Sequence, residues 1–243
     1  VFDVDVENGM FKERCEVEVD NSSYVIASSD GKTLYSIADE GVVSFRILPN
    51  GSLARLNSSS IRGMRGCHLC TDEEDKYVFV SGYHDGKTTV LSLNPDGSVG
   101  KIVDGVFDRG YGSVAERNFR PHVTCTRRMP DNRFVLSVDN GIDQVKIYRF
   151  NDKEQKLVQV DAIRCDLESA PRHFRYSKDG KFIYLMYELK KAIEVYTYKT
   201  GDRAPVIEKI QTISTTSTKN PDNLTAACAM RMSVDQKYIY CTN

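Results

Sequence analysis

The chain has 243 residues, with 33 Lys and Arg against 34 Asp and Glu and a formal net charge of −1. This balance gives no overall attraction to nucleic acid or to an anionic membrane surface, so we expect neither as a partner. No apolar run approaches the roughly 18 residues of a membrane helix. The seven cysteines are an odd number without disulfide spacing, and no secretory leader is visible, which predicts a reducing, cytoplasmic location.

A hairpin pattern recurs along the chain. In its clearest copy, residues 173–177 and 181–187 read as two short strands joined by an Asp179-Gly180 turn. Aligned on the basic residue that follows each turn, five copies repeat at intervals of 44, 57, 48 and 56 residues. Those basic residues are Lys32, Lys76, Arg133, Lys181 and Lys237.

A third strand follows each of the first four hairpins, and a weaker fourth segment follows it in most copies. The third strands are expected at residues 42–48, 88–93, 144–150 and 192–198. Four short strands in a unit of about 40–50 residues are typical of a β-propeller blade. We therefore predict an all-β fold in which residues 1–243 form one propeller domain, with four full blades between two half-blades. A β-sandwich or an irregular solenoid is the competing fold.

Candidate functional residues gather at the start of the predicted first strands. In a propeller these strands line the central channel and all run in the same direction, so the residues that open them should meet at one mouth. They are Tyr24, His68, His122, His173 and Arg231. The second strands end close by, at Tyr83, His84 and Glu188 among others. All four histidines fall in these two groups, which marks this mouth as the candidate site.

The loops that lead to this mouth are basic. Arg120 precedes His122, and Arg172 directly precedes His173. A cationic mouth on a nearly neutral protein predicts a small anionic ligand, such as a carboxylate or a phosphate ester, held by arginine. The alternative is that these arginines are solvated or paired with neighbouring Asp and Glu residues.

His122, His173 and Glu188 can perform general acid–base chemistry. An imidazole titrates near neutral pH, and a carboxylate beside Arg172 should stay ionised. The alternative is a structural network that ties the rims of the blades together. Because neighbouring strand residues alternate, we expect Arg172 and His173 to point to opposite faces, with only Arg172 aimed into the channel. We expect His84 to be an exposed loop residue.

We expect no metal and no other cofactor. The segment Cys67-His68-Leu69-Cys70 contains residue types that bind metals. However, residues three apart on a strand point to opposite faces, and the sequence has no second Cys/His pair at the spacing of a zinc site. The chain also has no Gly-x-Ser-x-Gly elbow, no Walker loop and no dinucleotide fingerprint.

The hairpin around Arg172 resembles the lactonase family of seven-bladed β-propellers, which includes bacterial 6-phosphogluconolactonases and fungal carboxy-muconate lactonizing enzymes. The resemblance is carried by Ala170-Pro171-Arg172-His173-Phe174, Asp179-Gly180-Lys181 and Tyr187-Glu188-Leu189, and also by Gly66-Cys67-His68 with Tyr83, Arg120-Pro121-His122 and residues 226–230. It implies seven blades, of which this chain covers about five, with sequence missing at both ends.

The resemblance also implies a function, the hydrolysis of a sugar-acid lactone such as 6-phosphogluconolactone. By residue, it implies catalytic roles for His122, Arg172 and Glu188, and substrate-binding roles for His68, Arg120, His173 and Tyr83. Many members have Glu where this chain has Ala229, and a further expected arginine would lie beyond Asn243. A non-catalytic binding propeller and a cycloisomerase of the same family are the alternatives, because one fold can host several reactions.

Overall fold

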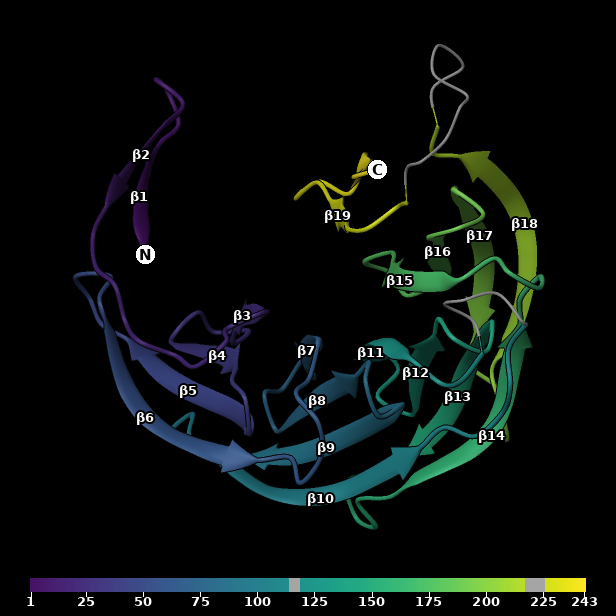
Figure 1. The fold of residues 1–243 in the computed structure, drawn as a ribbon, viewed down its shortest axis with the longest axis horizontal. Coiled ribbons are helices and arrows are strands. Elements are labelled where there is room, and N and C mark those ends of the chain that lie inside the picture. Colours follow the sequence, from purple (N-terminus) through teal and green to yellow (C-terminus); the bar gives the residue numbers. More distant parts are fainter. Residues whose placement is uncertain (114–118, 217–225) are drawn as a thin grey trace.

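The computed structural model describes residues 1–113, 119–216 and 226–243. Within these ranges the regular secondary structure consists of β-strands, without helices. Figure 1 shows their sheets arranged along an arc around a central axis. Within the described ranges, no helix is long and apolar enough to cross a membrane.

Four sheets have four strands each and two have two strands. Every four-stranded sheet is an antiparallel meander in which the strands follow one another in chain order. The first is β3 (Val25–Ala27), β4 (Thr33–Ile37), β5 (Gly41–Ile47) and β6 (Leu53–Ser60); the second is β7 (His68–Thr71), β8 (Tyr77–Gly82), β9 (Lys87–Leu93) and β10 (Val99–Phe107). The third is β11 (Val123–Arg128), β12 (Phe134–Asp139), β13 (Gln144–Phe150) and β14 (Leu157–Arg164); the fourth is β15 (Pro171–Tyr176), β16 (Phe182–Tyr187), β17 (Ala192–Lys199) and β18 (Val206–Ser214). The two-stranded sheets are β1 (Phe2–Asp5) with β2 (Met10–Glu13), and β19 (Met230–Met232) with β20 (Ile239–Cys241).

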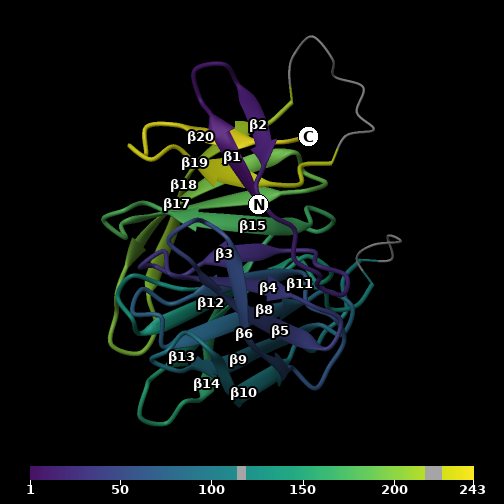
Figure 2. The ribbon, with the colours of Figure 1, turned by 90° about the vertical axis from the view of Figure 1, so that its left-hand side faces the viewer.

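This arrangement confirms the predicted four full blades between two half-blades. The third strands of the blades begin and end within one residue of the expected positions. The first strand of each blade lies on the inside of the arc and the fourth on the outside, and the two half-blades lie at the ends of the arc (Figures 1 and 2). The propeller architecture therefore brings the starts of β7, β11 and β15 close to one another.

The turn of each hairpin explains why the repeat is visible in the sequence. The residue before each basic residue has a left-handed backbone, with φ between 50° and 69°. These residues are Gly31, Asp75, Asn132, Gly180 and Gln236. In the fourth blade, Asp179 Oδ1 accepts hydrogen bonds from Ser177 Oγ at 2.5 Å and Lys181 N at 3.1 Å. Gly, Asn and Asp tolerate this conformation better than other residues, which favours them in the turn.

Apolar side chains fill the space between neighbouring blades. The cluster between the β11–β14 and β15–β18 sheets includes Phe134, Leu136 and Phe174, all fully buried. Similar clusters lie between the first and second blades, between the second and third, and between the fourth blade and the β19–β20 half-blade. Because the second and third blades are covered on both faces, β8 and β12 are buried at every residue. This double coverage explains why the second strands read as continuous apolar runs instead of alternating ones.

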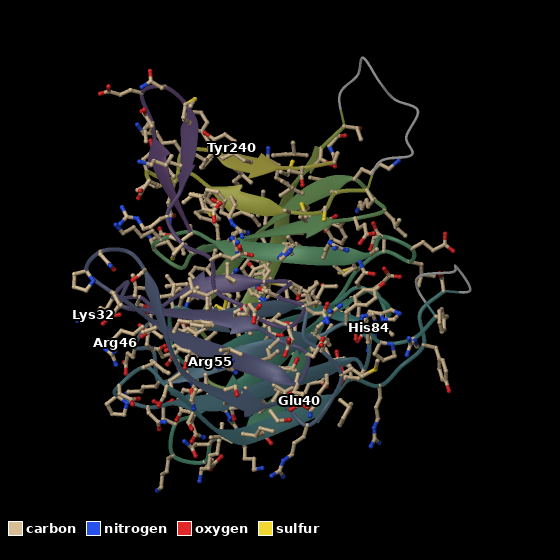
Figure 3. The ribbon with its side chains drawn as sticks, turned by 60° about the vertical axis from the view of Figure 1, so that its left-hand side comes forward. Lys32, Glu40, Arg46, Arg55, His84 and Tyr240 are labelled. Atoms are coloured by element: carbon tan, nitrogen blue, oxygen red, sulfur yellow. The ribbon has the colours of Figure 1, made fainter. Side chains whose placement is uncertain are left out.

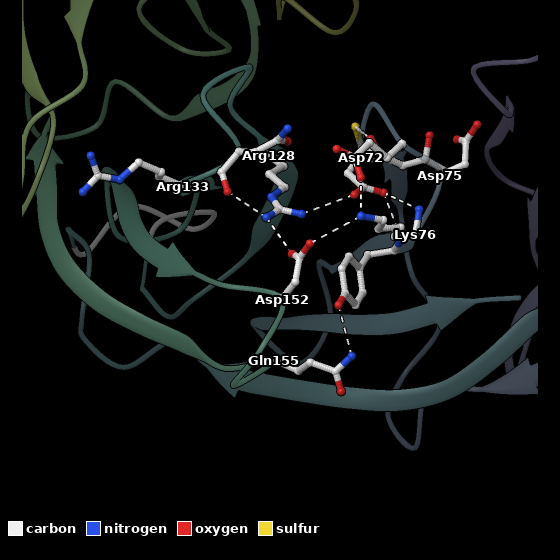
Figure 4. Close-up of polar contacts among 12 residues, drawn as sticks. Asp72, Asp75, Lys76, Arg128, Arg133, Asp152 and Gln155 are labelled. Atoms are coloured by element: carbon white, nitrogen blue, oxygen red, sulfur yellow. Dashed lines mark hydrogen bonds and ion pairs between the residues drawn. The ribbon is translucent and has the colours of Figure 1, made fainter.

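A buried ion pair also joins two neighbouring blades (Figure 4). Arg128 Nη1, at the end of β11, is 3.2 Å from Asp72 Oδ2, and the two side chains are only 5% and 1% exposed. Arg128 Nη2 contacts Asp152 Oδ1 at 2.8 Å. The other oxygen of Asp72 accepts the backbone N–H groups of Lys76 and Tyr77. The carboxylate therefore depends on Arg128 for the neutralisation of its charge.

Replacing Arg128 with Met should leave the Asp72 carboxylate buried without its cation. We expect the free energy of unfolding to fall by about 3–5 kcal/mol, measured by urea denaturation at neutral pH. The matched control is Lys181→Met, which removes only the exposed Lys181–Asp179 pair and should cost less than about 1 kcal/mol. Equal losses in the two variants would show that burial of the Arg128 pair has no special effect on stability.

Candidate active site

Two β-bulges shape the inner ends of the first strands. The register of β11 against β12 shifts between Val123 and Cys125, and that of β15 against β16 shifts between Pro171 and His173. A bulge sets two residues of one strand against one residue of its partner and redirects their side chains. The bulges of adjacent blades are linked, because Thr124 Oγ1 donates a hydrogen bond to the carbonyl of Arg172 at 2.7 Å.

Arg172 and His173, which we expected to point to opposite faces, both line one cavity. Their side chains have different neighbours there: Arg172 contacts Glu188 and Cys228, and the ring of His173 lies beside that of His68. Strict alternation applies to a regular strand, but Arg172 stands in the irregular register between Pro171 and His173. The bulge therefore brings two neighbouring residues to the same site.

This cavity has a volume of about 430 Å³ and is built by three neighbouring blades. It is lined by Cys67, Tyr83, His84, Thr124, Arg172, His173 and Glu188. Tyr83, Arg172, His173 and Glu188 are residues that the sequence analysis selected, and the structure places them together. Their roles in binding and catalysis stay predictions.

An ion pair between Arg172 and Glu188 forms one wall of the cavity. Arg172 Nη1 is 2.5 Å from Glu188 Oε2, and the side chains are 29% and 9% exposed. Asn140 Nδ2 donates to the same carboxylate oxygen at 3.2 Å, and Arg172 Nε donates to the carbonyl of Cys228 at 3.1 Å. Burial works against the charged form of Arg172, but the Glu188 carboxylate outweighs it and the pKa of Arg172 is raised. The site therefore holds a permanent cation in a fixed orientation, which suits the binding of an anionic oxygen.

His122 lies behind Tyr83 rather than on the cavity wall. The two rings stack with their centroids 4.3 Å apart, and His122 Nδ1 is 2.7 Å from the Tyr83 carbonyl oxygen. Because a carbonyl can only accept, Nδ1 carries the proton and Nε2 carries the lone pair. Burial lowers the pKa of His122, so its ring is neutral at pH 7. The imidazole has the tautomer of a general base, although its side chain is only 4% exposed.

The loop that follows β12 holds His122 in place. Asp139 Oδ1 accepts the backbone N–H groups of His122 at 2.8 Å and of Gly141 at 3.0 Å. A Cβ atom at Gly141 would collide with the carbonyl oxygen of Arg120 and would come within 2.7 Å of the His122 ring. Only glycine allows the two loops to approach this closely.

The remaining predicted residues surround the cavity. His68 is fully buried, with its ring centroid 4.8 Å from that of Tyr24 and 5.4 Å from that of His173. Burial lowers the pKa of His68 to about 4. Arg120 Nη1 donates to the carbonyl of His84 at 3.2 Å. His84 lines the cavity and is exposed, as expected; it is labelled in Figure 3.

Sequence reasoning missed Cys125, although the repeat contains the signal that identifies it. Cys125 stands eight residues before the basic residue of its repeat, as do His68 and His173 in theirs. The three side chains meet inside the arc, and their ligand atoms lie within 4.8 Å of one another. His122 stands eleven residues before Arg133, so it is not equivalent to the other two histidines and lies in the loop before β11.

Comparison with known proteins identifies the family. The sequence matches the family described as lactonase, 7-bladed beta-propeller, over residues 1–243. The chain belongs to this family. It is 29% identical over 248 residues to the 6-phosphogluconolactonase of Bacillus subtilis, a match that covers 100% of this chain and 69% of that protein. Family membership supports a lactone hydrolase as the general class of activity.

Solved structures show the same fold. A Bacteroides fragilis protein proposed to be a 6-phosphogluconolactonase superposes with a TM-score of 0.85 at 29% identity, and the match covers 100% of this chain and 69% of that one. The periplasmic gluconolactonase of Pseudomonas aeruginosa superposes with a TM-score of 0.88 at 23% identity, covering 99% of this chain and 70% of that one. The second similarity concerns the fold alone. The chain thus spans about 70% of the length of these proteins.

Asp139 should make stability depend on pH. Burial, together with the neighbouring Asp108, raises the pKa of Asp139 to about 8 from an ordinary value of 3.8. A carboxyl whose pKa is raised by folding stabilises the fold fully at low pH, and this contribution is lost as the pH rises towards the folded pKa. In urea denaturation between about pH 5 and pH 8, Asp139→Asn should therefore lose less stability than the wild type.

The control for this experiment is Asp179→Asn, at an exposed turn where hydrogen bonds from Ser177 and Lys181 lower the carboxyl pKa to about 2. This carboxyl is already ionised at pH 5, so its replacement should leave the slope of stability against pH unchanged. If the stability of Asp139→Asn falls with pH as steeply as that of the wild type, the raised pKa of Asp139 is contradicted.

Proposed function

We propose that the protein hydrolyses a sugar-acid lactone and that 6-phosphogluconolactone is its substrate. The family and the 29% identity to the Bacillus subtilis 6-phosphogluconolactonase support this proposal. The main structural observation behind the proposed lactone hydrolysis is the Arg172–Glu188 ion pair on the wall of a cavity between three blades. A fixed guanidinium in a partly desolvated cavity attracts an anionic group and stabilises a developing oxyanion. All seven cysteines are free, which agrees with the cytoplasmic location that we include in the proposal.

Opening of a lactone begins when water adds to the carbonyl carbon and negative charge develops on the carbonyl oxygen. In our proposal Arg172 stabilises this oxygen, and Arg120 at the rim attracts the phosphate. The base is His173, which lines the cavity, or His122, whose Nε2 carries the lone pair behind Tyr83. It takes the proton from the attacking water and returns it to the ring oxygen as the carbon–oxygen bond breaks. Glu188 orients Arg172, and His173 and Tyr83 contact the sugar.

Replacement of Arg172 by Met should lower kcat/KM for 6-phosphogluconolactone by about 10²–10³-fold, because the oxyanion loses its cation. The assay follows formation of 6-phosphogluconate through a coupled dehydrogenase, after subtraction of spontaneous hydrolysis. Lys181→Met is the control, since Lys181 lies in the same blade at an exposed turn away from the cavity. It should retain wild-type activity.

Failure to accelerate hydrolysis of 6-phosphogluconolactone, glucono-δ-lactone or any other lactone of a panel would overturn the enzyme proposal and favour a binding propeller. Activity on unphosphorylated lactones alone would overturn the choice of substrate. Lactone formation from a muconate-type acid, without hydrolysis, would identify a cycloisomerase.

The pH dependence of activity tests the assignment of the base. His122 must be neutral to accept a proton, and burial lowers its pKa from 6.5. In the wild type, kcat/KM should rise with pH as His122 loses its proton, with the midpoint of the rise below pH 6.5. His122→Gln should lose this acidic limb and be about 10²–10⁴-fold slower. His173→Gln should keep the acidic limb of the kcat/KM profile. If His173→Gln loses this limb and His122→Gln keeps it, the base is His173.

A further inference from the structure

Beneath the cavity, three side chains from three adjacent blades face one another. His68, Cys125 and His173 each offer one ligand atom, and these atoms lie within 4.8 Å of one another. Cys125 Sγ is 3.6 Å from His68 Nε2. A thiolate and an imidazole bound to one small metal ion, with metal–ligand lengths of about 2.3 and 2.0 Å, stand about 3.5 Å apart. One ligand pair therefore already has the separation that a shared ion requires.

One ring nitrogen of each histidine in this cluster lacks a hydrogen-bond partner, whereas His68 Nε2 lies 3.2 Å from Arg127 Nη2. Nδ1 of His68 and Nδ1 of His173 are buried and form no hydrogen bond within the described residues. Cys125 is fully buried, so its thiol cannot exchange partners with bulk water. Buried polar groups are normally satisfied, and a soft sulfur beside two imidazoles matches the ligand preference of thiophilic metals.

The positive charge of Arg127 beside the cluster favours a monovalent over a divalent metal ion. Arg127 is partly buried beside the cluster, with Nη2 3.2 Å from His68 Nε2 and Nη1 3.3 Å from Cys70 Sγ. No carboxylate forms a salt bridge with Arg127 in the part of the chain that the structure describes. A divalent ion bound to one thiolate would add a positive charge beside this guanidinium, which is costly in a poorly solvated interior. A monovalent ion that replaces the thiol proton leaves the buried charge unchanged.

We propose that His68, Cys125 and His173 bind one Cu⁺ ion directly beneath the candidate active site. The step is a ligand exchange in which the Cys125 S–H bond breaks, an S–Cu bond forms, and the proton is released to solvent. No electron is transferred. The site departs from the expectation of no metal, because the ligands come from three repeats and share no local spacing in the sequence.

The cavity supplies a path to this site. His173 lines the cavity and is partly exposed, whereas His68 and Cys125 lie deeper. An ion that enters the cavity meets His173 first and then passes to the two buried ligands. Arg127 gives up its hydrogen bond to His68 Nε2 when the metal takes that lone pair, and it keeps its contact with Cys70.

Anaerobic titration with Cu⁺ against the chromophoric chelator bicinchoninate tests the proposal. It uses the purified protein with Cys228, the exposed cysteine, changed to Ser so that surface binding is suppressed. One equivalent of Cu⁺ should leave the chelator. Cys125→Ser should abolish this transfer, and His173→Gln should weaken it at least tenfold. Cys67→Ser, which removes a cysteine outside the three ligands, is the matched control and should bind as the parent does.

Circular dichroism and thermal unfolding of each metal-free variant establish that loss of binding is not loss of fold. X-ray absorption at the copper edge should show one sulfur and two nitrogen neighbours. Absence of competition with the chelator, or undiminished binding in Cys125→Ser, would overturn the site. Zn²⁺ binding as tight as Cu⁺ binding would overturn the choice of a monovalent ion. None of these measurements depends on lactone hydrolysis.

Discussion

The packing of each blade against its neighbours is the constraint on which the rest of this structure depends. Apolar side chains such as Phe134, Leu136 and Phe174 fill the spaces between adjacent sheets, and the second strands of the middle blades are buried on both faces. Sheets that are covered in this way must stand side by side around an axis, with their first strands innermost (Figure 1). The convergence of β7, β11 and β15, and with it the cavity, follows from this packing.

Irregular backbone then shapes the candidate site within this packed interior. The bulge at the start of β15 turns both Arg172 and His173 toward one cavity, and the Thr124 hydroxyl ties this bulge to the one in the adjacent blade. Glu188 and Asn140 complete the arrangement by fixing the guanidinium. The Arg172 guanidinium is therefore held by protein partners on its own, an arrangement that would reduce the ordering cost of binding an anion.

The candidate site could be predicted from the sequence only as far as the repeat could be aligned. Arg172 and Glu188 were placed together because a hairpin must bring its two ends side by side, and the structure shows them paired. The sequence did not predict that His173 would line the cavity together with Arg172, because a bulge cannot be recognised in a short run of residues. His122 was grouped with His68 and His173, but it lies three residues earlier in its repeat and stacks behind Tyr83.

The sequence by itself determined the all-β class, the four-stranded blade and the position of each hairpin. These features depend on local rules, namely apolar runs of strand length and left-handed turn residues such as Gly180, which act over a few residues. Only the tertiary structure decided which side chains meet. Cys125 lies 57 residues from His68 and 48 from His173, and no local rule relates them. They come together because the blades pack around a common axis, and that packing is a property of the whole chain.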